Sequence, residues 1–106
     1  MGEKERLRVT FSSEARENLS QILSWSAESF GPKIAQGYVE FLTEEIMSLA
    51  LGHASSRTVP TRPNLRYKII RRHTSRNGHI VIFRVAPEEI EVLHIFHTAQ
   101  DWINKL

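Results

Sequence analysis

The sequence predicts an α+β fold, ordered β-α-α-β-β-β, in which a helical hairpin packs on one face of an antiparallel sheet. Three observations predict it: apolar and polar residues alternate near the N-terminus, apolar residues recur at helical spacing through the middle, and alternation returns in the last third. The chain of 106 residues is long enough for one domain, which we expect to cover residues 1–106.

The first predicted strand covers residues 7–11, where every second residue is apolar. Ser12 or Ser13 then offers an N-cap for the first helix, whose apolar residues continue at helical spacing. Gly31-Pro32 provides a stop and a first-turn start, so a second helix follows immediately and ends at Gly52. This tight junction predicts that the two helices form an antiparallel hairpin.

Residues 53–64 are predicted to form a loop, because Pro60 and Pro63 block regular structure. Three strands then follow, over residues 66–73, 79–86 and 90–96. The last of these is apolar on both faces, which favours a central position in the sheet. Thr98 is able to cap a short terminal helix through Lys105.

Positive charge is concentrated in one part of the chain, although the formal net charge is only +2. From Ile46 to Pro87 there is no Asp or Glu. The same stretch holds Arg57, Arg62, Arg66, Lys68, Arg71, Arg72, Arg76 and Arg84. Such segregation favours a binding surface for a polyanion or an acidic protein over a merely solvated face.

Side-chain alternation predicts where these cations lie. If the apolar residues of the first and central strands face the helices, the residues between them face away. The outer face would then carry Arg6, Arg8 and Arg84, with either Arg66, Lys68 and Arg72 or else Arg71, according to register. We therefore expect a concave basic surface on the sheet face opposite the helices.

Composition narrows the function classes. Cysteine is absent, which excludes disulfides, thiolate metal sites and a cysteine nucleophile and suits a reducing cytoplasm. No apolar run approaches the roughly 20 residues needed to cross a bilayer, so no membrane association is expected. The five histidines form no HExxH motif, and we expect neither a metal site nor a cofactor.

The order and spacing of several segments resemble the RelE/ParE superfamily of toxins from bacterial type II toxin–antitoxin modules. These segments are residues 15–22, Phe30-Gly31 with the helix that follows, Leu65-Arg66, 78–85 and 90–97, and a His-x-x-x-Asp ending from His97 to Asp101. Gly78-His79-Ile80-Val81-Ile82-Phe83 and the His-x-x-x-Asp ending look closer to the ParE branch.

The resemblance implies one of two activities. RelE-like members cleave messenger RNA on the ribosome, whereas ParE-like members inhibit DNA gyrase by binding. Lys68 matches the first lysine of RelE-like members, but Ile70 and Ile80 stand where a second lysine and an arginine would be. An isoleucine cannot stabilise the transition state of phosphate cleavage, so we expect a gyrase-binding inhibitor rather than an enzyme.

Two alternatives stay open. One is a metal-independent, ribosome-dependent endoribonuclease, whose catalytic residues would be Lys68, Arg71, Arg84 and His97. The other is a non-toxic member that binds an antitoxin.

The resemblance also implies partners: a cognate antitoxin with an acidic, flexible C-terminal segment, and operator DNA only through that antitoxin. Candidate antitoxin-binding residues are Arg6, Arg8, Trp25 and Tyr38. Candidate target-binding residues are Arg66, Arg71, Arg72, Arg76, Arg84, His97, Asp101 and Trp102. Asp101 is expected to pair with an arginine and fix the tail. Both tryptophans are expected to pack against the domain, with partner contact as the alternative.

Overall fold

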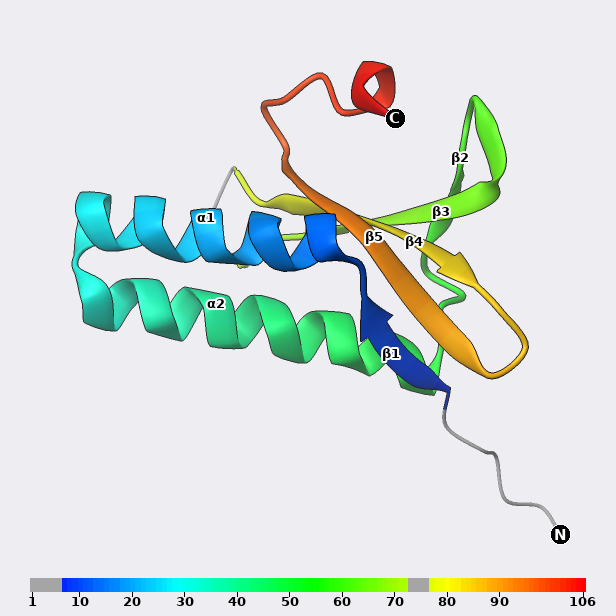
Figure 1. Ribbon diagram of the computed structural model, residues 1–106, viewed down its shortest axis with the longest axis horizontal. Coiled ribbons are helices and arrows are strands. Elements are labelled where there is room, and N and C mark those ends of the chain that lie inside the picture. The colour runs from blue at the N-terminus through cyan, green and yellow to red at the C-terminus, as the bar shows by residue number, and fades with distance from the viewer. Residues whose placement is uncertain (1–6, 73–76) are drawn as a thin grey trace, which may run out of the picture.

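The computed structural model describes residues 7–72 and 77–106 (Figure 1). Its elements are β1 (Arg8–Phe11), α1 (Ser13–Phe30), α2 (Pro32–Met47), η1 (Ser48–Leu51), β2 (Arg57–Val59), β3 (Arg62–Ile70), β4 (His79–Val85), β5 (Glu89–His97) and η2 (Ile103–Lys105). The α+β class and the helical hairpin are confirmed. None of the described helices combines the length and apolar character needed to span a bilayer.

The hairpin forms where the sequence places its caps. The Ser12 hydroxyl oxygen accepts a hydrogen bond from the Ala15 N–H at 3.0 Å, and the hydroxyl donates to the Leu93 carbonyl at 2.7 Å. Gly31 ends α1 and begins α2 with a φ of 93°, a conformation that favours glycine. Ser12 therefore fixes the start of α1, and Gly31 fixes the junction between the two helices, as the sequence predicts.

The five-stranded sheet has the order β1-β5-β4-β3-β2 and is mixed rather than antiparallel. β1 pairs with β5 in parallel, and the other neighbours pair antiparallel. Only a tight turn forces two strands to run in opposite directions. Because β1 and β5 are separated by most of the chain, their direction is set by the packing of the hairpin, and the all-antiparallel prediction is wrong here.

The predicted loop over residues 53–64 contains β2 and the beginning of β3. β2 is an edge strand, and the pairing of β3 with β4 begins only at Arg66. Pro63 therefore precedes the part of β3 that needs ladder hydrogen bonds on both sides, so its missing N–H is tolerated. The prolines mark the outer end of a β-ribbon rather than an unstructured connection.

Two apolar clusters lie on opposite faces of the sheet. The helix-side core is formed by Ala15, Leu42, Ile46, Leu49, Ile70, Val81, Phe83, Ile90, Val92 and Ile95. The outer cluster is formed by Val59, Leu65, Ile80, Ile82 and Phe96, against which Tyr67, Leu93, Trp102 and Leu106 pack. The C-terminal segment therefore covers part of the face turned away from the helices (Figure 1).

This second cluster corrects the predicted basic outer surface. Ile80 and Ile82 do face away from the helices, but directly paired residues of antiparallel strands share a face. Arg66 pairs with Phe83 and Lys68 with Val81, so both cations lie on the helix side of the sheet. The register therefore excludes the alternative that places Arg66 and Lys68 on the outer face.

The terminal helix is shorter than predicted. The chain forms only the 3-10 turn η2, and Thr98 does not cap it. The Thr98 hydroxyl oxygen instead accepts a hydrogen bond from the Gly78 N–H at 3.2 Å, and the Thr98 N–H donates to the Gly78 carbonyl at 3.0 Å. These contacts attach the start of the tail to the beginning of β4.

Candidate functional site

A cleft of about 870 Å³ opens between the helical hairpin and the adjoining ends of β4 and β5. We call it the hairpin cleft. Its apolar side is lined by Trp25, Phe30 and Ile34, and its polar end by Tyr38, Arg72, His79 and His97. Because α1, α2, β4 and β5 all contribute to it, the cleft depends on the docking of the hairpin against the sheet.

The apolar side of the cleft is unusually exposed for large side chains. Trp25 and Phe30 are each 59% exposed, and Ile34 is 62% exposed. The two aromatic rings meet edge to face with centroids 5.9 Å apart. Trp25 therefore packs on Phe30 while most of its side chain stays exposed, so the expected packing against the domain is only partial.

At the polar end of the cleft, side-chain rings from α2, β4 and β5 contact one another. The Tyr38 hydroxyl lies 2.5 Å from Nδ1 of His79, and the rings of His79 and His97 stand edge to face at 5.3 Å. These two histidines are direct partners in the β4–β5 pairing. Nδ1 of His97 accepts a hydrogen bond from the Ala99 N–H at 3.0 Å, which fixes that ring against the turn after β5.

Burial sets the charge of this end. Burial, with a smaller contribution from the neighbouring His97, lowers the pKa of His79 to about 4, so His79 is neutral at pH 7. Burial also raises the pKa of Tyr38, against the opposing influence of Arg72, so the phenol stays protonated. The permanent charge at the polar end is therefore the Arg72 guanidinium.

Arg72 is held in place by α2. Its Nη2 donates to the Gly37 carbonyl at 2.9 Å, and its guanidinium carbon lies 5.0 Å from the ring centroid of Phe41 and 5.8 Å from that of Tyr38. Stacking on aromatic faces orients a guanidinium while leaving its edge accessible. The cleft thus presents one positioned cation beside an apolar wall.

A second cationic surface lies on β2, β3 and the turn between them, which we call the basic ribbon (residues 57–70). It carries Arg57, Arg62, Arg66 and Lys68. Arg66 donates from Nε to the Ser56 hydroxyl at 2.6 Å and from Nη2 to the Ser56 carbonyl at 2.8 Å. Arg62 donates to the Leu106 carbonyl at 2.8 Å.

The structure does not bring the predicted target-binding residues into one patch. Arg66 lies on the basic ribbon, Arg72 and His97 lie in the hairpin cleft, and Arg84 pairs with Glu91. Arg71 follows β3 directly. Arg6 and Arg76 lie outside the described residues.

The tail also differs from its prediction. Among the described residues, Asp101 pairs with no arginine; its carboxylate accepts a hydrogen bond from the Asn104 amide at 2.7 Å. Trp102 instead fixes the tail, because its ring packs on Tyr67 at 4.9 Å between centroids. Packing, the favoured interpretation of this tryptophan, is confirmed.

The residues named for a nuclease are dispersed. Arg84 lies five residues beyond His79 along β4, and His79 is the direct partner of His97. At about 3.4 Å per residue, roughly 17 Å of strand separates the two ends. Arg84 also faces the outer side, since its neighbours Phe83 and Val85 pack on the helix side.

The sequence interpretation missed His79 and the apolar wall of Phe30 and Ile34. A signal for His79 was present: it begins one strand of a hairpin whose partner strand ends at His97, so the two were in position to pair. Among the described residues, no group of three or more His, Asp or Glu side chains is placed to hold a metal ion.

Comparisons with known proteins agree with this architecture. A family model described as the ParE toxin of the type II toxin–antitoxin system parDE matches residues 9–102. The solved structure of the chromosomal ParDE toxin–antitoxin system from P. aeruginosa aligns with a TM-score of 0.72 at 21% identity, over 86% of this chain and 95% of that one. No curated protein matches. At this identity, the structural alignment shows a shared fold.

Proposed function

Because the chain belongs to the ParE toxin family of type II toxin–antitoxin systems, we propose that it inhibits DNA gyrase by binding and that a cognate antitoxin neutralises it. No chemical step on the target is required. Family membership supports the target, whereas separate features of the molecule support the mode of action and the docking surface of the antitoxin.

Two buried isoleucines support the proposal that the protein acts by binding its target and not by cleaving RNA. Ile70 is 2% exposed in the helix-side core, and Ile80 is 3% exposed in the outer cluster. These positions would hold a lysine and an arginine in a RelE-like nuclease. A charged side chain placed there would be buried without a partner, at a cost of several kcal/mol. The scaffold at both positions is therefore built for packing, not for phosphate chemistry.

The hairpin cleft is the proposed antitoxin site. Trp25, Phe30 and Ile34 leave an exposed apolar wall, and Arg72 adds a cation beside it. No Asp or Glu occurs among the described residues that line the cleft. An amphipathic segment with acidic residues along one edge fits this combination of an apolar wall and a positive end.

β1 offers a second contact for the same antitoxin. It is the edge strand on the side of β5, so its outer edge is able to pair with an added strand. Arg8 lies on this strand, 3.9 Å from Glu89. A flexible segment that leaves the cleft and reaches β1 would wrap the toxin from two sides.

A supercoiling assay tests the proposal. Relaxed plasmid, ATP and purified gyrase are incubated with increasing amounts of the protein, with and without its antitoxin. Loss of supercoiling that the antitoxin restores supports the proposal. Full supercoiling at an excess of the protein contradicts it, and unimpaired growth on expression without antitoxin would instead favour the non-toxic alternative.

One observation favours the endoribonuclease as a second candidate. Tyr38, His79 and His97 form a contiguous group in the hairpin cleft, with Arg72 stacked on Tyr38. Primer extension on translated messages would reveal cuts in the ribosomal A site. Their absence in growth-arrested cells would remove this candidate.

A further inference from the structure

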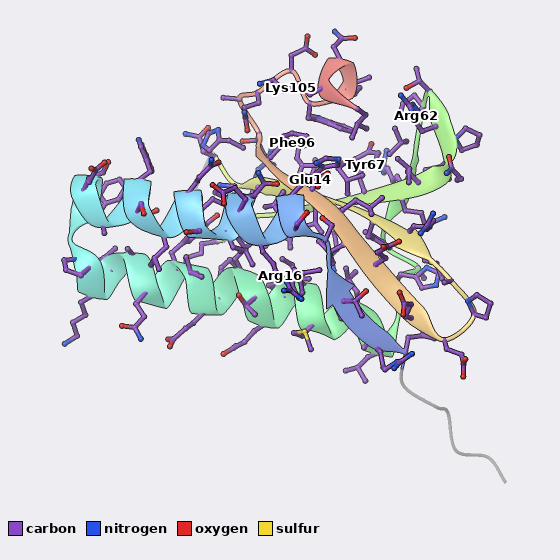
Figure 2. The ribbon with its side chains drawn as sticks, in the orientation of Figure 1. Glu14, Arg16, Arg62, Tyr67, Phe96 and Lys105 are labelled. Carbon is purple, nitrogen blue, oxygen red and sulfur yellow. The ribbon has the colours of Figure 1, made fainter. Side chains whose placement is uncertain are left out.

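The edge of the sheet at β2 is protected against pairing with a further strand. β2 is only three residues long, and its pairing with β3 shifts register between Thr58 and Val59. It also begins with the exposed Arg57, and Figure 2 shows Arg62 at the outer end of the β2–β3 pair. A short, irregular and charged edge is a poor template for another strand.

β5 is also protected in the part that extends beyond β1. The Ser12 hydroxyl donates to the Leu93 carbonyl at 2.7 Å. Two residues further along β5, the side-chain oxygen of Asn18 accepts a hydrogen bond from the Ile95 N–H at 2.9 Å. Side chains at the start of α1 therefore satisfy edge groups of β5 that a further strand would otherwise bind.

β1 presents an edge of a different kind. The Arg8 N–H donates to the Glu88 carbonyl at 3.1 Å, so the backbone groups of the even-numbered residues face β5. The N–H and C=O groups of Leu7, Val9 and Phe11 therefore point away from the sheet. No described strand covers them, since β1 is the last strand on this side. This edge is able to form a complete set of ladder hydrogen bonds with a partner.

An apolar groove runs beside the same edge. It has a volume of about 620 Å³ and lies between β1 and the end of the helical hairpin, where Met47 and Leu51 line it (Figure 1). Met47 is 46% exposed and Leu51 is 68% exposed, the highest value for a large apolar side chain among the described residues. At this edge, the sheet therefore does not fully cover the apolar surface of the helical layer.

Charge beside β1 does not favour an acidic partner. Glu44 lines the groove together with Arg8. Arg8 also lies 3.9 Å from Glu89, so its charge is already partly compensated. A partner at this edge is therefore recognised through the backbone of β1 and the apolar groove.

The edge of β1 is complementary to a second copy of itself. In an antiparallel pairing centred on Val9, Leu7 of each copy faces Phe11 of the other, and all outward-facing residues form hydrogen-bonded pairs. These three side chains pack on the helix side of the sheet. Arg8 faces Thr10 of the other copy, so no like charges lie directly opposite each other.

We propose that β1 pairs antiparallel with β1 of a second copy of this chain, which joins the two sheets across a two-fold axis. Directly paired residues share a face, so the helical layers of both copies lie on the same side of the joined sheet. The inference goes beyond the proposed function, because inhibition of gyrase does not require self-association. It also places the second copy in competition with the antitoxin for β1.

Sedimentation velocity of the purified protein over a range of concentrations tests the proposal. We expect a species of twice the monomer mass of 12.2 kDa, which dissociates on dilution. Leu51→Glu places a charge in the apolar groove and should raise the dimer dissociation constant by about tenfold or more. Val9→Pro removes an outward-facing N–H without removing a hydrogen bond to β5, and it should also weaken the dimer.

Ile69→Glu is the matched control for Leu51→Glu. Ile69 is 44% exposed and lies on β3, which β4 and β5 separate from β1. We expect this variant to dimerise like the parent, and circular dichroism will verify that all three variants are folded.

A parent protein that stays monomeric at every concentration, or equal weakening by Leu51→Glu and Ile69→Glu, would overturn the proposal. A monomeric parent whose β1 variants lose affinity for the antitoxin would assign this edge to the antitoxin alone. Gyrase inhibition is measured on the same samples. A monomeric parent that inhibits gyrase contradicts only this inference, whereas a dimeric parent that leaves gyrase active contradicts only the proposed function.

Discussion

The Tyr38 hydroxyl of α2 lies 2.5 Å from Nδ1 of His79, the first residue of β4. This contact ties the helical hairpin to the start of β4, the middle strand of the sheet, at the polar end of the hairpin cleft. His79 is 9% exposed, so its ring nitrogen has little access to water as a replacement partner. A part-buried hydrogen bond between a helix and a strand therefore helps to hold the polar end of the cleft.

Removing this hydroxyl should destabilise the fold. Tyr38→Phe leaves the His79 nitrogen without a partner, and we expect it to lower the free energy of unfolding by about 1–2 kcal/mol. Urea denaturation followed by circular dichroism measures this. The matched control is Tyr67→Phe, because no hydrogen bond of the Tyr67 hydroxyl to a described residue occurs. An equal loss of unfolding free energy in both variants would show that the Tyr38–His79 hydrogen bond makes no specific contribution to stability.

His79 makes stability depend on pH in a defined window. Its pKa is about 4 in the folded protein and 6.5 without the fold, so the unfolded chain binds the proton more readily between these values. The contribution of neutral His79 to the free energy of unfolding is fully present above pH 6.5 and is lost progressively as the pH falls towards 4. In the variant His79→Gln, the free energy of unfolding should change less over this window than in the parent. If the free energy of unfolding varies with pH in the same way in the parent and the variant, the lowered pKa of His79 is refuted.

Alanine substitutions at two glycines should change the stability of the protein in opposite directions. Gly31 has a φ of 93°, so Gly31→Ala strains the helix junction and should cost about 1 kcal/mol or more. Gly37 lies inside α2, and an added Cβ would meet no atom within 4 Å outside the neighbouring helix backbone, so Gly37→Ala should stabilise by about 0.5–1 kcal/mol. Thermal unfolding of the two variants checks this pair. A destabilised Gly37→Ala variant would mean that the helix needs its glycine for another reason.

The two tryptophans should separate stability from antitoxin binding. Trp102→Ala removes the packing on Tyr67 over the outer cluster and should destabilise by about 1–3 kcal/mol. Trp25→Ala removes a mostly exposed ring and should change stability by about 0.5 kcal/mol or less. Isothermal titration should show that Trp25→Ala lowers the affinity for the antitoxin tenfold or more, because a large aromatic side chain in a cleft is a typical binding anchor. Parental affinity in that variant would place the antitoxin elsewhere.

The parts of the fold that depend on local chemistry could be predicted from the sequence. Ser12 and Gly31 determine the helix ends through their own caps and backbone conformation, so the hairpin was predictable. The direction of β1 and the face of Arg66 depend instead on contacts between distant segments. A bulge between Ile82 and Phe83 in the β4–β5 pairing adds a further register shift that no local pattern reveals.

The candidate site divides in the same way. Trp25 and Tyr38 were found because they lie beside the apolar stripe of the hairpin, which is a local pattern. The Arg72–Tyr38 stacking and the His79–His97 pair require the strands to be in register, which the sequence alone does not fix. Charge segregation predicted one basic face opposite the helices, whereas the structure divides these cations between the cleft and the basic ribbon.

The most direct test of the central claim is a titration of gyrase-catalysed supercoiling with the purified protein, in a reaction that contains no ribosomes. We expect inhibition that increases to completion with protein concentration and disappears when the antitoxin is added. Supercoiling that continues at its full rate at a large excess of correctly folded protein would contradict the account.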